Sequence, residues 1–143
     1  MPSQRVRIVD AAAMKTMQGF RGRLENEAKT RPEVPIKAEE VLAALEKDGI
    51  TLERKRQQLA SSQHASYCLG TRTGKRIQIT VCEYASVEQA EESVKRTQKL
   101  ERPERRIERL GQLTLLTRRG LNQDEDAPLV DKVFTTFLAL GGP

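Results

Sequence analysis

Two short segments, residues 66–70 and 77–82, constrain the fold most strongly, because apolar and polar residues alternate along both of them. A period of two places successive side chains on opposite faces of a β-strand, so each segment predicts a strand with one apolar face. The intervening Thr73-Gly74-Lys75 predicts a turn, since glycine adopts a positive φ angle without strain. The core face of the expected β-hairpin carries Tyr67, Leu69, Ile77, Ile79 and Val81.

Helical patterns lie on both sides of this hairpin. Residues 37–47 predict a helix followed by Gly49, a residue type that commonly ends one. Ser86, with a glutamine three residues later, predicts a capped helix that runs to about Leu100, and Pro128 suits the first turn of a last helix. The side chains expected to face inward are Val41, Leu42 and Leu45 in the first helix, Val87, Ala90, Val94 and Thr97 in the second, and Val130, Val133, Phe134, Phe137 and Leu138 in the third.

Two further regions complete the expected sheet. Residues 50–59 suit either a strand or a helix, and we interpret them as an edge strand because charge on an edge strand blocks aggregation. Residues 107–117 predict a second hairpin or a bulged strand, with Gly111 at the bend. We therefore expect an α+β fold: an antiparallel sheet of four to five strands with helices on one face, preceded by an N-terminal amphipathic helix, in the order α-α-β-β-β-α-β-β-α with that helix first.

That N-terminal helix is predicted by apolar residues that recur every three or four positions up to residue 28. Prolines 32 and 35 must end it, because proline lacks the N–H that a helix needs. We expect a helical arm at 1–30, a linker at 31–36 and an α+β domain at 37–143. The apolar stripe of the helical arm either docks on another protein or a second copy of the chain, or folds back onto the sheet. The stripe includes Val9, Ala13, Met17, Phe20 and Leu24.

The composition argues against several classes of protein. The chain has 143 residues, which suits one domain, and lacks the run of about 18 apolar residues that a membrane-spanning helix needs. One histidine and two cysteines exclude a zinc site built from these residue types alone. His64 precedes Cys68 by four residues, about 13 Å along a strand, which is too far for a catalytic dyad. We expect no enzymatic activity, no metal and no cofactor.

The positive charge gives a second hypothesis. The chain carries a formal net charge of +5, and its arginines offer a basic surface for nucleic acid. Aromatic residues make up only 3%, so base stacking is nearly absent and duplex binding through phosphates is what remains. The loop at 70–76 has three residues between its glycines instead of four, so it is not a phosphate-binding loop of the Walker type. The candidate anion-binding residues are Arg54, Arg56, Arg72, Lys75, Arg76, Arg105 and Arg106, with Arg118 and Arg119 later in the chain.

Cys68 and Cys82 are predicted to lie on neighbouring strands, on the face opposite to Ile79. In the register that pairs Tyr67 with Val81, the two cysteines are diagonal neighbours, roughly 7–8 Å apart at Cα and beyond easy disulfide reach. A bulge or a two-residue change of register would place them opposite each other. Without that change they are two buried thiols, which behave as small apolar groups.

The hairpin also carries a resemblance. Tyr67-Cys68, a basic turn, Val81-Cys82-Glu83-Tyr84 and the Ala/Glu-rich helix that follows resemble small uncharacterised envelope proteins of bacteria, often lipoproteins. The resemblance covers roughly residues 37–140 and implies a Cys68–Cys82 disulfide and a periplasmic or envelope location after removal of a leader, with the cytoplasm as the alternative. It implies no activity. Our leading hypothesis is a non-enzymatic interaction or structural module that docks through its N-terminal helix.

Overall fold

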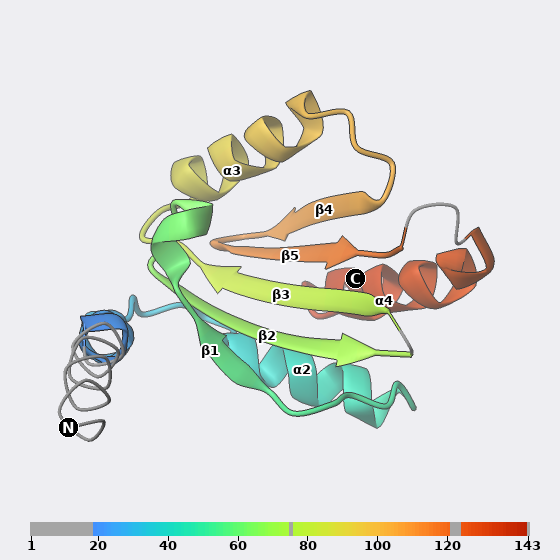
Figure 1. Cartoon of the computed structure of the whole chain (residues 1–143), viewed down its shortest axis with the longest axis horizontal. Helices are drawn as coiled ribbons and strands as arrows, with labels where there is room; N and C mark the ends of the chain where they lie inside the picture. Colours follow the sequence, from blue (N-terminus) through green and yellow to red (C-terminus); the bar gives the residue numbers. More distant parts are fainter. Residues whose placement is uncertain (1–18, 75, 121–123, 143) are drawn as a thin grey trace, which may run out of the picture.

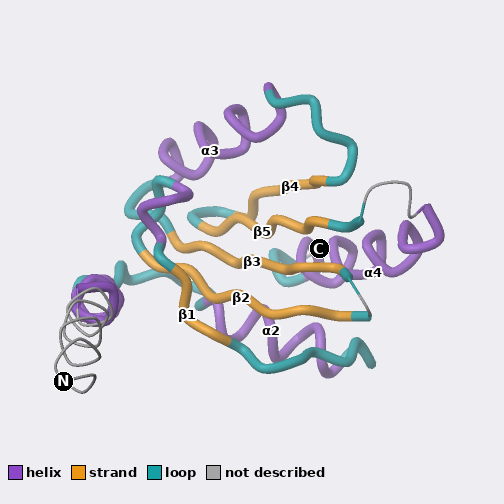
Figure 2. Tube along the Cα trace, in the orientation of Figure 1, coloured by secondary structure: helices purple, strands orange, loops and turns teal. Residues whose placement is uncertain are grey.

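The structure is a computed structural model that describes residues 19–74, 76–120 and 124–142. It consists of one five-stranded antiparallel sheet with helices packed against it (Figures 1 and 2). The α+β class and the approximate order of elements that the sequence predicts are confirmed. Val9, Ala13, Met17 and Lys75 lie outside the described residues.

The strands of the sheet lie in the order β1-β2-β3-β5-β4. Two hairpins, β2–β3 and β4–β5, lie side by side, and β1 and β4 form the edges. Gly111 adopts a φ of 60° at the turn of the second hairpin, as its residue type predicts. The strands are β1 (Arg56–Gln58), β2 (Tyr67–Thr73), β3 (Ile77–Glu83), β4 (Arg105–Leu110) and β5 (Leu113–Arg118).

The expected edge strand at 50–59 is shorter than predicted, because only β1 pairs regularly. Residues 51–55 instead run beside β2 through single hydrogen bonds: the Glu53 N–H donates to the carbonyl of Arg72. The hydroxyls of Thr71 and Thr73 donate to the carbonyls of Glu53 and Thr51, respectively. These side-chain bonds fix the segment along the sheet without a regular ladder.

The helices cover both faces of the sheet, whereas the sequence pattern predicts helices on one face only. Helices α2 (Ala38–Lys47) and α4 (Ala127–Ala139) pack on one face, which we call the core face. Helix α3 (Val87–Lys99) and the 3-10 turn η1 (Ala60–Gln63) cover part of the opposite face, and α3 contacts mainly β4 (Figure 1). A second 3-10 turn, η2 (Asp124–Asp126), precedes α4. The alternation of apolar and polar residues along β3 does not predict a helix on the opposite face, because that face is only partly covered.

The main core lies between the core face and helices α2 and α4. Alternate strand residues supply the sheet side of it, which confirms the predicted period of two. Leu138 was predicted to face inward, but it is 39% exposed because α4 turns that side to solvent. The fully buried side chains of this core include Val41, Leu42, Leu45, Ile77, Ile79, Val81, Leu115, Val133, Phe134 and Phe137.

A smaller cluster on the opposite face explains the position of α3. The Tyr84 hydroxyl donates to Ser93 Oγ at 2.7 Å and accepts from Thr114 Oγ1 at 3.2 Å, so one buried phenol joins α3 to β5. Ala90 packs beside it at the inner side of the helix. Val87, predicted to face inward, is 37% exposed because it lies in the first turn, outside this cluster.

Candidate binding surfaces

Cys68 and Cys82 form a disulfide between β2 and β3. They are directly opposite each other, and their Cα atoms are 4.1 Å apart, the short spacing typical of a non-hydrogen-bonded pair. The register therefore differs by two residues from the one that pairs Tyr67 with Val81. Thr73 pairs with Ile77, so Thr73 belongs to β2 and not to the turn, where the sequence analysis placed it.

Both sulfur atoms lie in the small cluster under η1 and α3, on the face opposite to the main core, as predicted. Neither cysteine offers a thiolate in this state, since both are bonded. His64 ends η1 with a φ of 54° and is exposed, instead of opening a strand. The pair therefore has a structural role in the hairpin.

The linker after the N-terminal helix is anchored by a buried carboxylate. Glu83 is fully buried and accepts from Arg31 Nε at 2.8 Å and from Arg31 Nη2 at 2.6 Å. The same carboxylate accepts from the backbone N–H of Ala38 at 2.8 Å, at the positive end of the α2 dipole. Glu83 thus fixes the linker and caps α2, whose N-cap residue, Lys37, makes no side-chain bond of its own.

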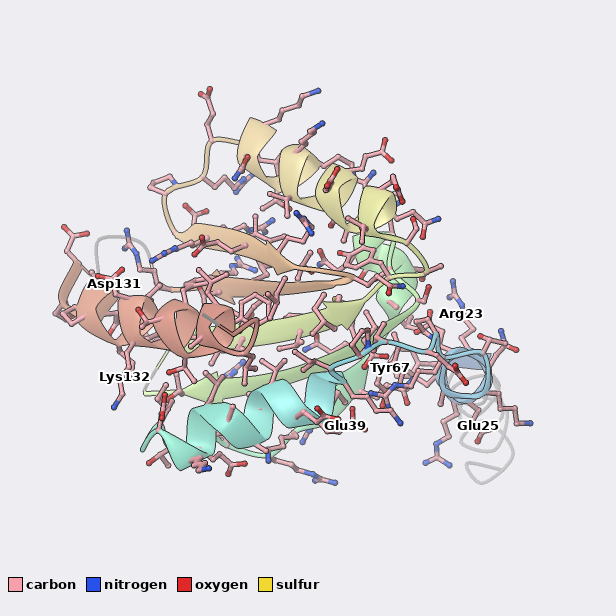
Figure 3. The ribbon with its side chains drawn as sticks, turned by 180° about the vertical axis from the view of Figure 1, so that it is seen from behind. Arg23, Glu25, Glu39, Tyr67, Asp131 and Lys132 are labelled. Carbon is pink, nitrogen blue, oxygen red and sulfur yellow. A yellow bond between two sulfur atoms is a disulfide. The ribbon has the colours of Figure 1, made fainter. Side chains whose placement is uncertain are left out.

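Arg31 has two further partners. Its guanidinium lies 4.0 Å from the centroid of the Tyr67 ring and also bonds the carboxylate of Glu39. The bonds to Glu83 and Glu39 raise the pKa of Arg31 above its ordinary value, and the bond from Arg31 lowers the pKa of Glu39. Burial raises the pKa of Tyr67. Figure 3 shows Glu39 and Tyr67 near the start of α2.

The described part of the N-terminal helix, residues 19–29, is held by polar contacts. Glu27 accepts from the backbone N–H groups of Ala60 and Ser61 at 2.8 and 3.3 Å, at the start of η1. Gln57 Nε2 donates to the Leu24 carbonyl at 2.7 Å. No residue of this described helix belongs to either buried cluster, and Phe20 is 48% exposed. The helix stands beside the sheet, with Arg23 and Glu25 on it (Figures 1 and 3).

The sequence pattern does not predict these anchors. Arg31 and Glu83 are 52 residues apart, and Glu27 and Ala60 are 33 apart. No periodic pattern links such positions. The one available signal was Glu83 itself, since an acidic residue on the core face of a predicted strand requires a partner.

The candidate anion-binding arginines divide between the two faces. Arg106 lies on the core face, where it bonds Asp131 at 2.8 Å and Glu108 at 2.8 Å and stacks 4.3 Å from the centroid of the Phe134 ring. Arg106 therefore connects β4 to α4 through Asp131 and Phe134. The structure places Arg56, Arg72, Arg105 and Arg118 on the opposite face, where Arg54, Arg56 and Arg72 line one hollow at the β1 edge.

Comparisons with protein-family models, curated proteins and solved structures find no match to this chain. Within residues 19–74, 76–120 and 124–142, no group of three or more His, Cys, Asp or Glu side chains is placed to hold a metal ion. None of the helices in these ranges is long and apolar enough to span a membrane. Two surfaces stand out: the helix at 19–29 and the arginine-bearing sheet face.

Proposed function

We propose that this protein is a non-enzymatic interaction module of the bacterial cell envelope that docks through its N-terminal helix, with a second copy of the chain as its partner. The observation that carries the proposal is the way the helix at 19–29 is held. Glu27 contacts the domain near the end of the described helix, while Phe20, two turns earlier on the same face, is 48% exposed. An exposed apolar stripe on a fixed helix is typical of a docking surface.

The contacts that fix the helix at 19–29 in place favour its binding to a partner. Glu27 and the Leu24 carbonyl connect it to η1 and β1, and the Arg31–Glu83 pair fixes the linker that follows. A helix held in one position before it meets its partner loses less conformational entropy on binding. The predicted stripe also continues toward the N-terminus, in residues outside the described range.

The charges beside the stripe favour a second copy over an unrelated protein. Arg21 and Glu25 are four residues apart and flank Phe20 and Leu24 on the same side. When two copies of this helix pack antiparallel about a twofold axis, Arg21 of one faces Glu25 of the other, and the reverse. The surface is therefore complementary to itself in charge and in its apolar stripe.

The envelope location is supported by the disulfide. Cys68 and Cys82 form a disulfide. Disulfides persist in oxidising compartments such as the bacterial periplasm and are rare in the cytosol. The cytoplasm is the alternative. Titration of free thiols in protein isolated from cells without reductant tests the location: we expect none, and two free thiols would contradict the envelope proposal.

The docking proposal is tested by size-exclusion chromatography with light scattering on the full chain over a range of concentrations. We expect a species of twice the chain mass of 16.1 kDa. Phe20→Ser weakens dimerisation about tenfold or more, because it removes an aromatic group from the centre of the interface. Leu100→Ser is the matched control, since Leu100 is 54% exposed on a different element.

A charge exchange separates a specific interface from general stickiness. Glu25→Arg alone weakens the dimer by placing like charges opposite each other, and the double variant Arg21→Glu/Glu25→Arg restores it. A chain that stays at 16.1 kDa at every concentration contradicts pairing of two copies. Equal effects of Phe20→Ser and Leu100→Ser would contradict docking through the helix.

A further inference from the structure

A row of arginines crosses the sheet face opposite to the main core. The register pairs Arg72 with Gln78, Gln78 with Arg118, and Arg118 with Arg105. Four strands thus contribute one line of side chains to the same face. Since neighbouring strands are about 4.8 Å apart, the line extends over roughly 14 Å. We call the three arginines of this line, Arg72, Arg118 and Arg105, the arginine row.

The β1 edge extends this row. Arg56 pairs with Gly70 on the same face, and Arg54 lies two residues earlier, in the segment that runs beside β2. Together with Arg72 and Gln78 they line a shallow hollow of about 750 Å³. Its remaining lining residues are Glu53, Gln58, Gly70 and Thr71, so one carboxylate faces three guanidinium groups.

Repulsion between the positive charges of the row lowers the stability of the fold, and no carboxylate of the described chain pairs with them. Arg105 and Arg118 are direct cross-strand partners, and like charges in that position repel each other. Among the described residues, the side chains of Arg54, Arg56, Arg72 and Arg118 take part in no hydrogen bond or ion pair. Arg105 Nε is the one buried side-chain nitrogen or oxygen within the same ranges that has no hydrogen-bond partner.

The core face provides the contrast. Arg106, the next residue after Arg105, has two carboxylate partners and an aromatic ring beneath it. An arginine that serves the fold is therefore paired in this protein, and the arginines of the row are not. Guanidinium groups left with free N–H donors are suited to phosphate oxygens, which they bind with two parallel hydrogen bonds.

We propose that the arginine row binds a single polyphosphodiester chain that lies across the strands. One line of guanidinium groups fits one strand of phosphates, whereas a duplex presents two. The tyrosines and the two phenylalanines of α4 are buried, so this face offers no stacking platform and contacts the backbone and not the bases. The exposed large apolar residues of the described chain, Phe20, Val87, Leu100 and Leu138, lie outside the row, which disfavours insertion into a lipid surface.

The test is fluorescence anisotropy with the full chain and two labelled oligomers of equal length, an oligothymidylate and an abasic phosphodiester oligomer. We expect equal affinity for the two, because the backbone alone is recognised. The affinity falls with salt with a logarithmic slope of about −3, as four to five phosphate contacts on a single strand require. Tighter binding of the oligothymidylate would contradict backbone recognition.

Paired variants locate the site. Arg72→Gln/Arg118→Gln weakens binding about tenfold or more and makes the salt slope shallower by about 1.4, while thermal unfolding reports that the fold persists. Lys132→Gln is the control, since it removes a positive charge from exposed α4 on the other side of the sheet (Figure 3). Equal losses in both variants, or no binding at low salt, would overturn the proposal.

Two further arms separate the alternatives. Preference for duplex over single strand at equal phosphate concentration would contradict a one-chain site, and binding of phosphatidylglycerol vesicles without binding of either oligomer would replace it with a lipid surface. The Phe20→Ser variant is expected to bind the oligomers as well as the unmodified chain does. Failure of helix-mediated docking and failure of this site are therefore observed independently.

Discussion

Glu83 shows how one side chain connects three parts of the molecule. It is fully buried, yet its two oxygens accept from the linker guanidinium of Arg31 and from the first turn of α2. A buried carboxylate is costly unless such donors surround it, and here they do. Because Glu83 follows Cys82 directly, the hairpin that holds the disulfide also holds the linker.

Replacing this carboxylate tests its role. We expect Glu83→Gln to lower the free energy of unfolding by about 1.5–3 kcal/mol, because the amide keeps the shape but has one acceptor oxygen in place of two and no negative charge beside Arg31. The isosteric control Glu39→Gln loses less than about 1 kcal/mol, since the Glu39 side chain is 54% exposed. Urea unfolding of both variants measures the difference, and equal losses would show that burial of Glu83 is not what matters.

The lowered pKa of Glu39 predicts how the stability of the protein changes at acidic pH. Its pKa in the folded state lies below the ordinary value of 4.5, because Arg31 donates hydrogen bonds to the charged form. The unfolded chain therefore binds more protons in this range, so the contribution of Glu39 to stability is present above about pH 4.5 and is lost as the pH falls through its folded pKa. In urea unfolding from pH 7 to pH 3, we expect the stability difference between the unmodified chain and Glu39→Gln to shrink on acidification. A difference that is constant over this range would contradict the assignment.

At the scale of elements, the β2–β3 hairpin depends on its register. The hydroxyl of Thr73 donates a hydrogen bond to the carbonyl of Thr51, 22 residues away, and this bond favours Thr73 as part of β2. The turn therefore starts one residue later than the sequence suggests, and this moves Cys82 opposite Cys68. A local pattern of alternation predicts which face each residue occupies, but not how far one strand is shifted along the other.

The disulfide is expected to stabilise the domain by restricting the unfolded chain. The two cysteines are 14 residues apart, and a loop of about that length corresponds to roughly 3 kcal/mol. We expect the double variant Cys68→Ala/Cys82→Ala to lose about this amount in urea unfolding and to be insensitive to reductant. The unmodified chain should lose a similar amount when dithiothreitol is added. No effect of reductant on the unmodified chain would contradict the expectation.

At the scale of the whole molecule, the two sheet faces have different roles. The core face holds α2 and α4 and pairs its arginine, Arg106, internally. The other face is covered at one end by α3 and η1 and carries an unpaired arginine row. The helix at 19–29 stands outside both layers (Figure 1). The fold thus separates what stabilises the domain from the two surfaces we propose for binding.

Sequence alone was sufficient for the features that depend on near neighbours. Period-two alternation identified Ile77, Ile79 and Val81 as core residues, and Ser86 was correctly identified as the residue that caps α3, where it accepts from the Gln89 N–H. Such features are set by backbone geometry within a few residues. The face that α3 covers was predicted wrongly, because only the Tyr84 bonds to Ser93 and Thr114 decide it.

Tertiary structure alone decided which charges meet. Arg54 and Arg105 are far apart in the chain, and the order β1-β2-β3-β5-β4 places both on one face while it turns Arg106 to the other. Likewise, Arg31 and Glu83 are 52 residues apart, and only the packed fold places their side chains in contact. Charged side chains on a surface carry no periodic signal of their partners, because their pairing depends on strand order and register and not on local propensity.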